Sequence, residues 1–216
     1  MLESYYTVKK EGYTEITIQK SRFIGYVRRC DTEEEAQTFI KEIKKKHNDA
    51  NHNCSAYMIG EHDLIQKAND DGEPSGTAGV PMLEVLKRKG LKDTAVVVTR
   101  YFGGIKLGAG GLIRAYSSTT SEAIKATGIV KRQLMREMTV KADYSLLGKL
   151  ENEIRNSSFH LETINYLEIV ELVVYVESGR EDEFSNWITD LTSGQAELIH
   201  GDVNYAEIEV TDDEIE

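Results

Sequence analysis

Cysteine, proline and long apolar segments are all scarce in this sequence. Its 216 residues include two cysteines and two prolines, and two thiols are too few for a disulfide framework. No segment approaches the roughly 18 apolar residues of a membrane-spanning helix, and the first ten residues lack the apolar core of a signal peptide. Hydrophobic residues still make up 40% of the chain, enough for a sizeable core. We therefore expect a globular cytoplasmic protein with free thiols and no membrane association.

Basic residues are scarce in the last part of the chain. The net charge is −11, but residues 1–130 hold 19 Lys and Arg against 17 Asp and Glu, whereas residues 131–216 hold 7 against 20. This shift predicts two domains, at 1–131 and 132–216. Only the first has a charge suited to a polyanion. The acidic second domain either supports solubility or contacts a basic protein partner, and the sequence leaves the oligomeric state open.

One stretch dominates the first domain, residues 99–117, which read TRYFGGIKLGAGGLIRAYS. An apolar run precedes it and helical spacing follows, which predicts a strand, a glycine turn and a helix start. The free N–H groups and positive dipole end of such a helix can hold an anion. The predicted anion site consists of Arg100, Lys106, Gly108, Gly110, Gly111 and Arg114. Its ligand is a nucleic-acid phosphate, a small phosphorylated molecule or a partner's carboxylate, unless the turn binds nothing.

A Gly- and Pro-rich loop around Asp70 is the second candidate. Asp70, Asp71 and Glu73 can form a magnesium or general-base cluster, since hard cations take carboxylate oxygens. Solvated acids in a turn are the simpler interpretation and the one we favour, with Ser75 or Thr77 capping the helix that follows. The loop as a whole, including Ser75, stays a possible functional loop.

Metal and nucleophile patterns are weak. His47, His52 and Cys54 could be zinc ligands, but the sequence offers no fourth ligand at a useful spacing and no CxxC pair. A phosphate-binding GxxxxGK[ST] loop and a G-x-S-x-G elbow are both absent. We therefore predict no metal, no cofactor and no catalytic residue.

Strands and helices alternate through the first domain. Asp31 or Thr32 is expected to cap a helix with an acidic first turn and a basic last turn, as the helix dipole favours. Ser21-Arg22 is expected to separate the first two strands. We predict strands at 16–18, 23–27, 55–59, 64–68 and 95–98, and helices that end at Lys46, near Lys89 and at Gly128.

The second domain has a β-α-β-β-α-β pattern, typical of the ferredoxin-like split βαβ fold. A boundary is predicted at Lys131-Arg132-Gln133. The fold class is therefore α+β. The predicted elements are strands at 135–142, 159–164, 169–176 and within 196–210, with helices around 146–154 and 184–191.

Two motifs resemble the signature of a known family. DDGEPSGTAG, from Asp70, and TRYFGGIKLGAGGLIRAY, from Thr99, are similar to the IMPACT family and its YigZ-like group of uncharacterised bacterial proteins. Ser21-Arg22-Phe23 and His52-Asn53-Cys54 also fit. The specific likeness covers residues from about 20 to 125, and the rest of the chain matches the bacterial members in element order.

The resemblance implies a first domain like domain four of elongation factor G and a second like its ferredoxin-like domain five. The resemblance also implies that eukaryotic relatives bind a ribosome-associated activator and restrain the kinase that senses uncharged tRNA, through a different amino-terminal domain. We expect no such domain in this chain, so we do not expect the kinase-regulating role to transfer. What the resemblance implies for this chain is a translation-linked role in contact with RNA or the ribosome. It provides no established catalytic residues.

Three hypotheses follow from these patterns. The leading one is a non-enzymatic protein that contacts RNA phosphates, with Tyr101 and Phe102 either stacking on bases or packing in the core. The alternative is a magnesium-dependent phosphotransferase or hydrolase that uses the glycine turn and the acidic loop. The third is structural: the glycines let the helix pack close to the strand, Arg114 pairs with Asp70 or Asp71, and Gly110→Ala destabilises the fold.

Overall fold

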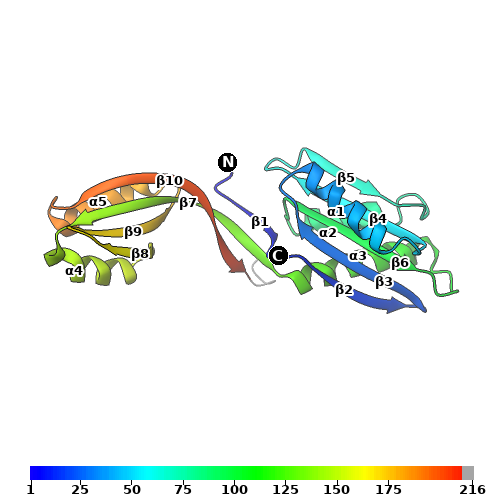
Figure 1. The fold of residues 1–216 in the computed structure, drawn as a ribbon. Helices are drawn as coiled ribbons and strands as arrows, with labels where there is room; N and C mark the ends of the chain where they lie inside the picture. Colours follow the sequence, from blue (N-terminus) through cyan, green and yellow to red (C-terminus); the bar gives the residue numbers. More distant parts are fainter. Residues whose placement is uncertain (211–216) are drawn as a thin grey trace. The chain divides into compact units, whose positions relative to one another are not determined.

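The computed structural model describes residues 1–210, which form five helices and ten strands in two compact units (Figure 1). Within the described residues, the first domain comprises Tyr5–Lys131 with 208–210, and the second comprises Met1–Ser4 with Arg132–Glu207. Helices and antiparallel strands occur in both domains. The predicted α+β class is therefore confirmed.

A five-stranded sheet of order β2-β3-β6-β4-β5 forms the centre of the first domain. The register shows that each neighbouring pair is antiparallel. The strands of this sheet are β2 (Gly12–Ile18), β3 (Ser21–Arg29), β4 (His52–Ile59), β5 (Ile65–Asn69) and β6 (Thr94–Tyr101). The helices of this domain are α1 (Glu33–Lys46), α2 (Gly79–Arg88) and α3 (Gly108–Thr127).

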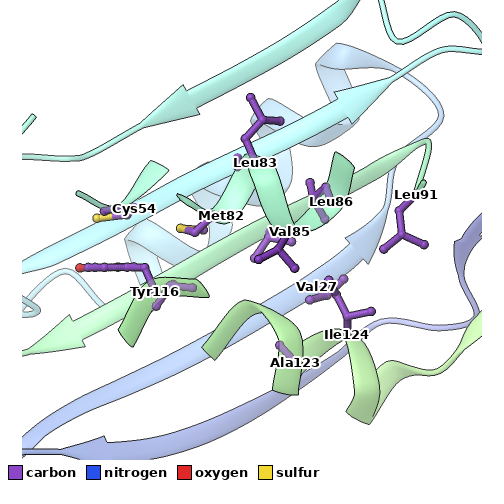
Figure 2. Packing of buried hydrophobic residues seen from close by; sticks show 14 of the residues in the cluster. Val27, Cys54, Met82, Leu83, Val85, Leu86, Leu91, Tyr116, Ala123 and Ile124 are labelled. Atoms are coloured by element: carbon purple, nitrogen blue, oxygen red, sulfur yellow. The ribbon is translucent and has the colours of Figure 1, made fainter. Parts of the chain in front are cut away.

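Helices cover both faces of this sheet (Figure 1). Because successive strand residues point to opposite faces, Phe23 and Val27 of β3 join the core with α2 and α3, whereas Ile24 and Tyr26 join the core with α1. Figure 2 shows the first core, in which side chains from α2 and α3 meet those of the sheet. The near-continuous burial of β3, β4 and β6 follows from this sandwiching.

Local signals in the sequence explain several element ends. Thr32 caps α1 by accepting a hydrogen bond from the Glu35 backbone N–H, one of the two caps predicted. The turn between β2 and β3 lies at Gln19-Lys20, not at Ser21-Arg22, so that prediction was wrong by two residues. Both turn residues have positive φ, 45° and 64°, which suits the twist of a two-residue hairpin.

Polar residues extend two strands beyond their predicted ends. The sequence places a loop before residue 55, yet β4 begins at His52. Asn53 is buried there, and its side chain is satisfied by two hydrogen bonds. It accepts one from Thr99 Oγ1 at 2.7 Å and donates one to His47 O at 3.1 Å. β6 likewise continues to Tyr101 and includes Arg100. Buried polar groups satisfied by such partners are compatible with a strand interior, which periodicity alone does not reveal.

The second domain has the predicted β-α-β-β-α-β order, with strands arranged β10-β7-β9-β8 and β1 (Ser4–Val8) also pairing with β7. Its core lies between the sheet and the two helices, with Leu150, Phe184 and Ile188 fully buried. Residues 131–133, the predicted boundary, lie inside strand β7. The elements are β7 (Ile129–Ala142), α4 (Tyr144–Arg155), β8 (His160–Tyr166), β9 (Val170–Glu177), α5 (Glu181–Thr192) and β10 (Glu197–Val210).

Candidate functional site

A pocket of about 460 Å³ opens in the first domain where β4 begins, β6 ends and α3 begins. Four of the residues predicted as functional line it, namely Glu73, Arg100, Lys106 and Gly108. The structure therefore brings together part of the predicted anion site and one residue of the acidic loop. The volume lies in the usual range for small-ligand sites.

Arg100 and Glu73 form a buried ion pair in the wall of this pocket. Arg100 Nη1 donates to Glu73 Oε1 at 2.7 Å, and the side chains are only 6% and 3% exposed. The Tyr116 hydroxyl donates to the same oxygen at 2.8 Å. The charge of Arg100 is thus largely neutralised inside the protein. The sequence suggests a free guanidinium at the anion site, and the structure shows that this guanidinium is paired with Glu73.

The three acids of the loop are held by donors of the protein, so the expectation of solvated turn acids was wrong. Asp70 accepts hydrogen bonds from the N–H groups of Gly76, Ala78 and Gly79 at 2.8–3.1 Å, and so caps α2. The predicted caps, Ser75 and Thr77, do not cap this helix, which has no cap from its own N-cap side chain.

Asp71 is fixed from two sides. It accepts hydrogen bonds at 2.6 Å from Lys44 Nζ and from the Asn53 N–H. Partial burial on its own raises the pKa of Asp71, but these two donors outweigh it and the net pKa lies below the ordinary value. No cluster of three metal-ligand side chains occurs within residues 1–210. The carboxylates therefore serve the loop and α2, and the structure assembles no magnesium cluster from them.

The amino end of α3 has the opposite character, because no acid neutralises it. The helix begins at Gly108, so the glycines predicted as a turn form its first turn. That turn contains no acidic residue, and no side chain caps it. Lys106 is exposed and forms no ion pair within the described part of the chain. Lys106 and the first α3 amides thus form a positive rim on the pocket.

Arg114 and Gly111 line a different concavity, of about 670 Å³, which shares Leu107 with the first. Arg114 is exposed and pairs with neither Asp70 nor Asp71, so the ion pair expected under the structural hypothesis is wrong. A Cβ on Gly110 would meet only Arg114 Nη1, at 3.6 Å. Gly110 is therefore not needed for close packing, whereas a Cβ on Gly111 would lie 3.0 Å from Leu107 Cβ and Gly108 has a positive φ of 69°.

Close packing requires glycine elsewhere. A Cβ on Gly103 would lie 1.9 Å from the Lys20 carbonyl oxygen, and one on Gly79 would lie 2.5 Å from the Asn69 nitrogen. These contacts tie the β2–β3 turn to the end of β6, and the start of α2 to the end of β5.

His52 is the pocket residue that sequence reasoning placed in a polar loop. Its Nδ1 is 2.9 Å from the Asp71 carbonyl oxygen, and its Nε2 is 3.8 Å from Glu73 Oε2. Since a carbonyl can only accept, Nδ1 donates and Nε2 of the neutral ring is an acceptor. The match of His52-Asn53-Cys54 to the family pattern was the signal that pointed to this position.

The other two residues once considered with His52 as zinc ligands have separate roles. His47 bonds to the hydroxyls of Tyr26 and Tyr101 at 2.7 and 2.9 Å. Burial raises the pKa of the Cys54 thiol to about 12, and its Sγ donates to the Asp70 carbonyl oxygen. A thiol of such high pKa is a poor nucleophile and a poor metal ligand at neutral pH.

Phe102 completes the edge of the pocket and is 46% exposed. Tyr101 is partly buried and donates to Asp49 Oδ1 at 3.0 Å. Of the two aromatic residues predicted either to stack on bases or to pack in the core, Phe102 alone presents its ring at this pocket.

These features define a two-domain α+β protein whose first domain has a pocket with a positive rim and a carboxylate wall. The Impact N-terminal domain family matches residues 19–124, and a domain of unknown function, DUF1949, matches residues 140–195. The chain is 61% identical over 207 residues to IMPACT family member YvyE of Bacillus subtilis, covering 96% of this chain and 95% of that protein. The chain belongs to the IMPACT family.

More distant relatives agree with this assignment. IMPACT family member YigZ of Escherichia coli is 35% identical over 191 residues, 84% of this chain and 90% of that protein. The protein IMPACT homolog of Dictyostelium discoideum is 32% identical over 108 residues, 48% of this chain and 31% of that protein. A solved structure titled "Crystal structure of an hypothetical protein" has a TM-score of 0.60 and 31% identity over 92% of this chain and 98% of that one. Within residues 1–210, no helix is long and apolar enough to span a membrane.

Proposed function

We propose that this protein binds structured RNA, free or within the ribosome, without catalysing a reaction, and that it acts in the cytoplasm in connection with translation. The contact surface is the amino end of α3: Lys106, the backbone amides from Gly108 to Gly111, and Arg114. Arg, Lys and backbone N–H groups are the usual partners of nucleic-acid phosphates.

The observation that carries this proposal is the unneutralised amino end of α3. A helix end carries about half a positive charge, and here neither a cap nor an acid in the first turn offsets it. Lys106 and Arg114 add two full charges without a carboxylate partner among the described residues. A near-neutral domain thus has a local positive site, suited to a few phosphate contacts.

The enzyme alternative has less support. It needs Asp70, Asp71 and Glu73 to share a magnesium ion, yet each carboxylate already accepts hydrogen bonds from other groups of the protein. Recruiting them would uncap α2 and break a buried ion pair. The acidic second domain stays a proposed surface for a basic protein partner.

Binding of labelled tRNA and ribosomal RNA across a salt series tests the proposal. The variant is Lys106→Glu with Arg114→Glu, and the control is Lys41→Glu with Lys67→Glu, an equal change of charge at exposed positions outside the pocket. Each phosphate contact contributes about 0.7–0.9 to the slope of log affinity against log salt. We expect the slope to fall by about 1.5 in the variant and to change less in the control.

Equal losses of RNA affinity and of salt slope in the two double variants would refute a specific contact surface at the amino end of α3. They would indicate that only the net charge of the protein matters. No binding by the unmodified protein would refute the RNA function itself. Arg100 is left unchanged in this experiment because a glutamate at that position would face Glu73 inside the protein.

A further inference from the structure

The lining of the pocket also includes two hydrogen-bond acceptors, one on Glu73 and one on His52. Glu73 Oε1 accepts hydrogen bonds from both Arg100 and Tyr116. The other oxygen, Oε2, has no hydrogen-bond partner among residues 1–210. The Glu73 side chain is 97% buried, given its 3% exposure, and it lines the pocket. Glu73 Oε2 is not among the fully buried unpaired atoms of the described residues, so it is reached from the pocket, where a ligand or water satisfies it.

His52 supplies the second acceptor. In the neutral imidazole, donation from Nδ1 to the Asp71 carbonyl oxygen leaves the lone pair of Nε2 free. Nε2 has no hydrogen-bond partner in the described chain and lies 3.8 Å from Glu73 Oε2. When His52 is neutral, Glu73 Oε2 and His52 Nε2 are both acceptors and repel each other unless a donor lies beside them; when the ring is protonated, the same two atoms form an ion pair. A pair of neighbouring hydroxyl groups provides one donor for each of these two acceptors. In dinucleotide-binding sites, a ribose hydroxyl donates to a carboxylate in the same way.

The remaining walls fit the other parts of a nucleotide. Lys106 and the α3 amides form a phosphate-accepting rim, and the half-exposed ring of Phe102 offers a stacking face for a base. The volume of about 460 Å³ lies within the usual range for sites that bind one small ligand. One pocket therefore contains Lys106 and the α3 amides for a phosphate, Phe102 for a base, and the two acceptors of Glu73 and His52.

We infer that this pocket binds one nucleoside 5′-phosphate with a free 2′,3′-diol, which in an RNA is the 3′-terminal nucleotide. Glu73 Oε2 and His52 Nε2 accept the two hydroxyl protons, and Lys106 with the α3 amides holds the phosphate. Internal nucleotides are rejected because their 3′ oxygen is esterified and has no proton to donate. The inference rests on the proposed function in one respect, that the source of this nucleotide is RNA.

Changes in the ligand test the inference without altering the protein. One short hairpin RNA with a single-stranded 3′ tail is prepared with a ribose, a 2′-deoxyribose or a 3′-phosphate at its last nucleotide. A site built to bind a hydroxyl discriminates strongly against its loss, so we expect at least tenfold weaker binding of both modified RNAs to the full-length protein. Equal affinity for all three would overturn the inference.

A variant of the acceptor wall provides a coupled measurement. His52→Phe removes the acceptor, and His62→Phe, at an exposed position outside the pocket, is the control. His52→Phe should bind the unmodified RNA about as weakly as the normal protein binds the deoxy form, with little further loss when both changes are combined. Independent, additive losses would overturn the assignment of His52. A thermal unfolding curve confirms that each variant is folded.

Free nucleotides separate this inference from the proposed function. Adenosine 5′-monophosphate, its 2′-deoxy form and adenosine 3′-monophosphate are titrated by calorimetry. Preference for adenosine 5′-monophosphate without any RNA binding supports the pocket and refutes the RNA function. RNA binding with a steep salt slope that ignores the 3′ end supports the function and refutes the pocket. No binding of any probe refutes both.

Discussion

Replacing Arg100 with methionine should destabilise the first domain by about 3–5 kcal/mol, because the change leaves the Glu73 carboxylate buried without its cation. The magnitude follows from the burial of the pair, whose side chains are 6% and 3% exposed and whose N–O distance is 2.7 Å. Only the Tyr116 hydroxyl would still donate to this carboxylate. Methionine keeps most of the side-chain volume, so the loss reports the charge and not a cavity.

Arg22→Met is the matched control. Arg22 lies on the neighbouring strand and pairs with Glu15 at 2.6 Å, but these side chains are 50% and 39% exposed, and such surface pairs contribute about 0–1 kcal/mol. Urea unfolding gives both free energies. The double variant Arg100→Met with Glu73→Met should lose at least about 2 kcal/mol less than the two single variants added together. Similar losses for Arg100→Met and Arg22→Met would refute a buried pair.

Three further predictions concern packing, protonation and thiol reactivity. Gly103→Ala should unfold the protein or lower its thermal stability sharply, since the new Cβ would lie 1.9 Å from the Lys20 carbonyl oxygen, while Gly110→Ala should be neutral or stabilising by up to about 1 kcal/mol; equal melting curves for both would contradict this packing. Burial lowers the pKa of His47 below its ordinary value near 6.5, so its contribution to stability is present above that value and is lost as the pH falls through the folded-state pKa; His47→Gln should therefore flatten the acid side of a stability–pH curve, and an unchanged curve would contradict the shift. Cys54, whose thiol pKa is raised by burial to about 12, should resist a thiol reagent until the protein is unfolded; fast labelling of the folded protein would contradict its burial.

Sequence patterns predicted the elements whose signals are local. Helix α1 needs only an apolar stripe, a cap at Thr32 and charges that suit the dipole. The second domain likewise follows from strand alternation and two amphipathic helices, and all six of its predicted elements are present. Each of these signals lies within about 15 residues of chain, where periodicity carries information.

What the sequence missed depends on contacts between distant residues. Asp70 caps α2 from eight residues before its N-cap, through a loop whose path the sequence does not reveal. Arg100 and Glu73 are 27 positions apart and meet only because the fold brings the end of β6 and the loop that carries Glu73 to one pocket. A motif rich in Gly, Arg and Lys therefore overstated the free positive charge. The anion-site residues themselves remain predictions, to be tested by binding.

The Arg100–Glu73 pair changes what the pocket can select. If Arg100 were free, the pocket would be positive throughout and would accept any small anion. Glu73 neutralises Arg100 through its Oε1 atom only. The other carboxylate oxygen, Oε2, is left as an acceptor beside His52. A bare phosphate would then satisfy the rim at Lys106 but leave the acceptor wall unpaired, whereas a ligand with a phosphate at one end and hydroxyls at the other satisfies both. Inorganic phosphate should therefore compete at least tenfold less well than adenosine 5′-monophosphate, and equal competition would show that the acceptor wall selects nothing.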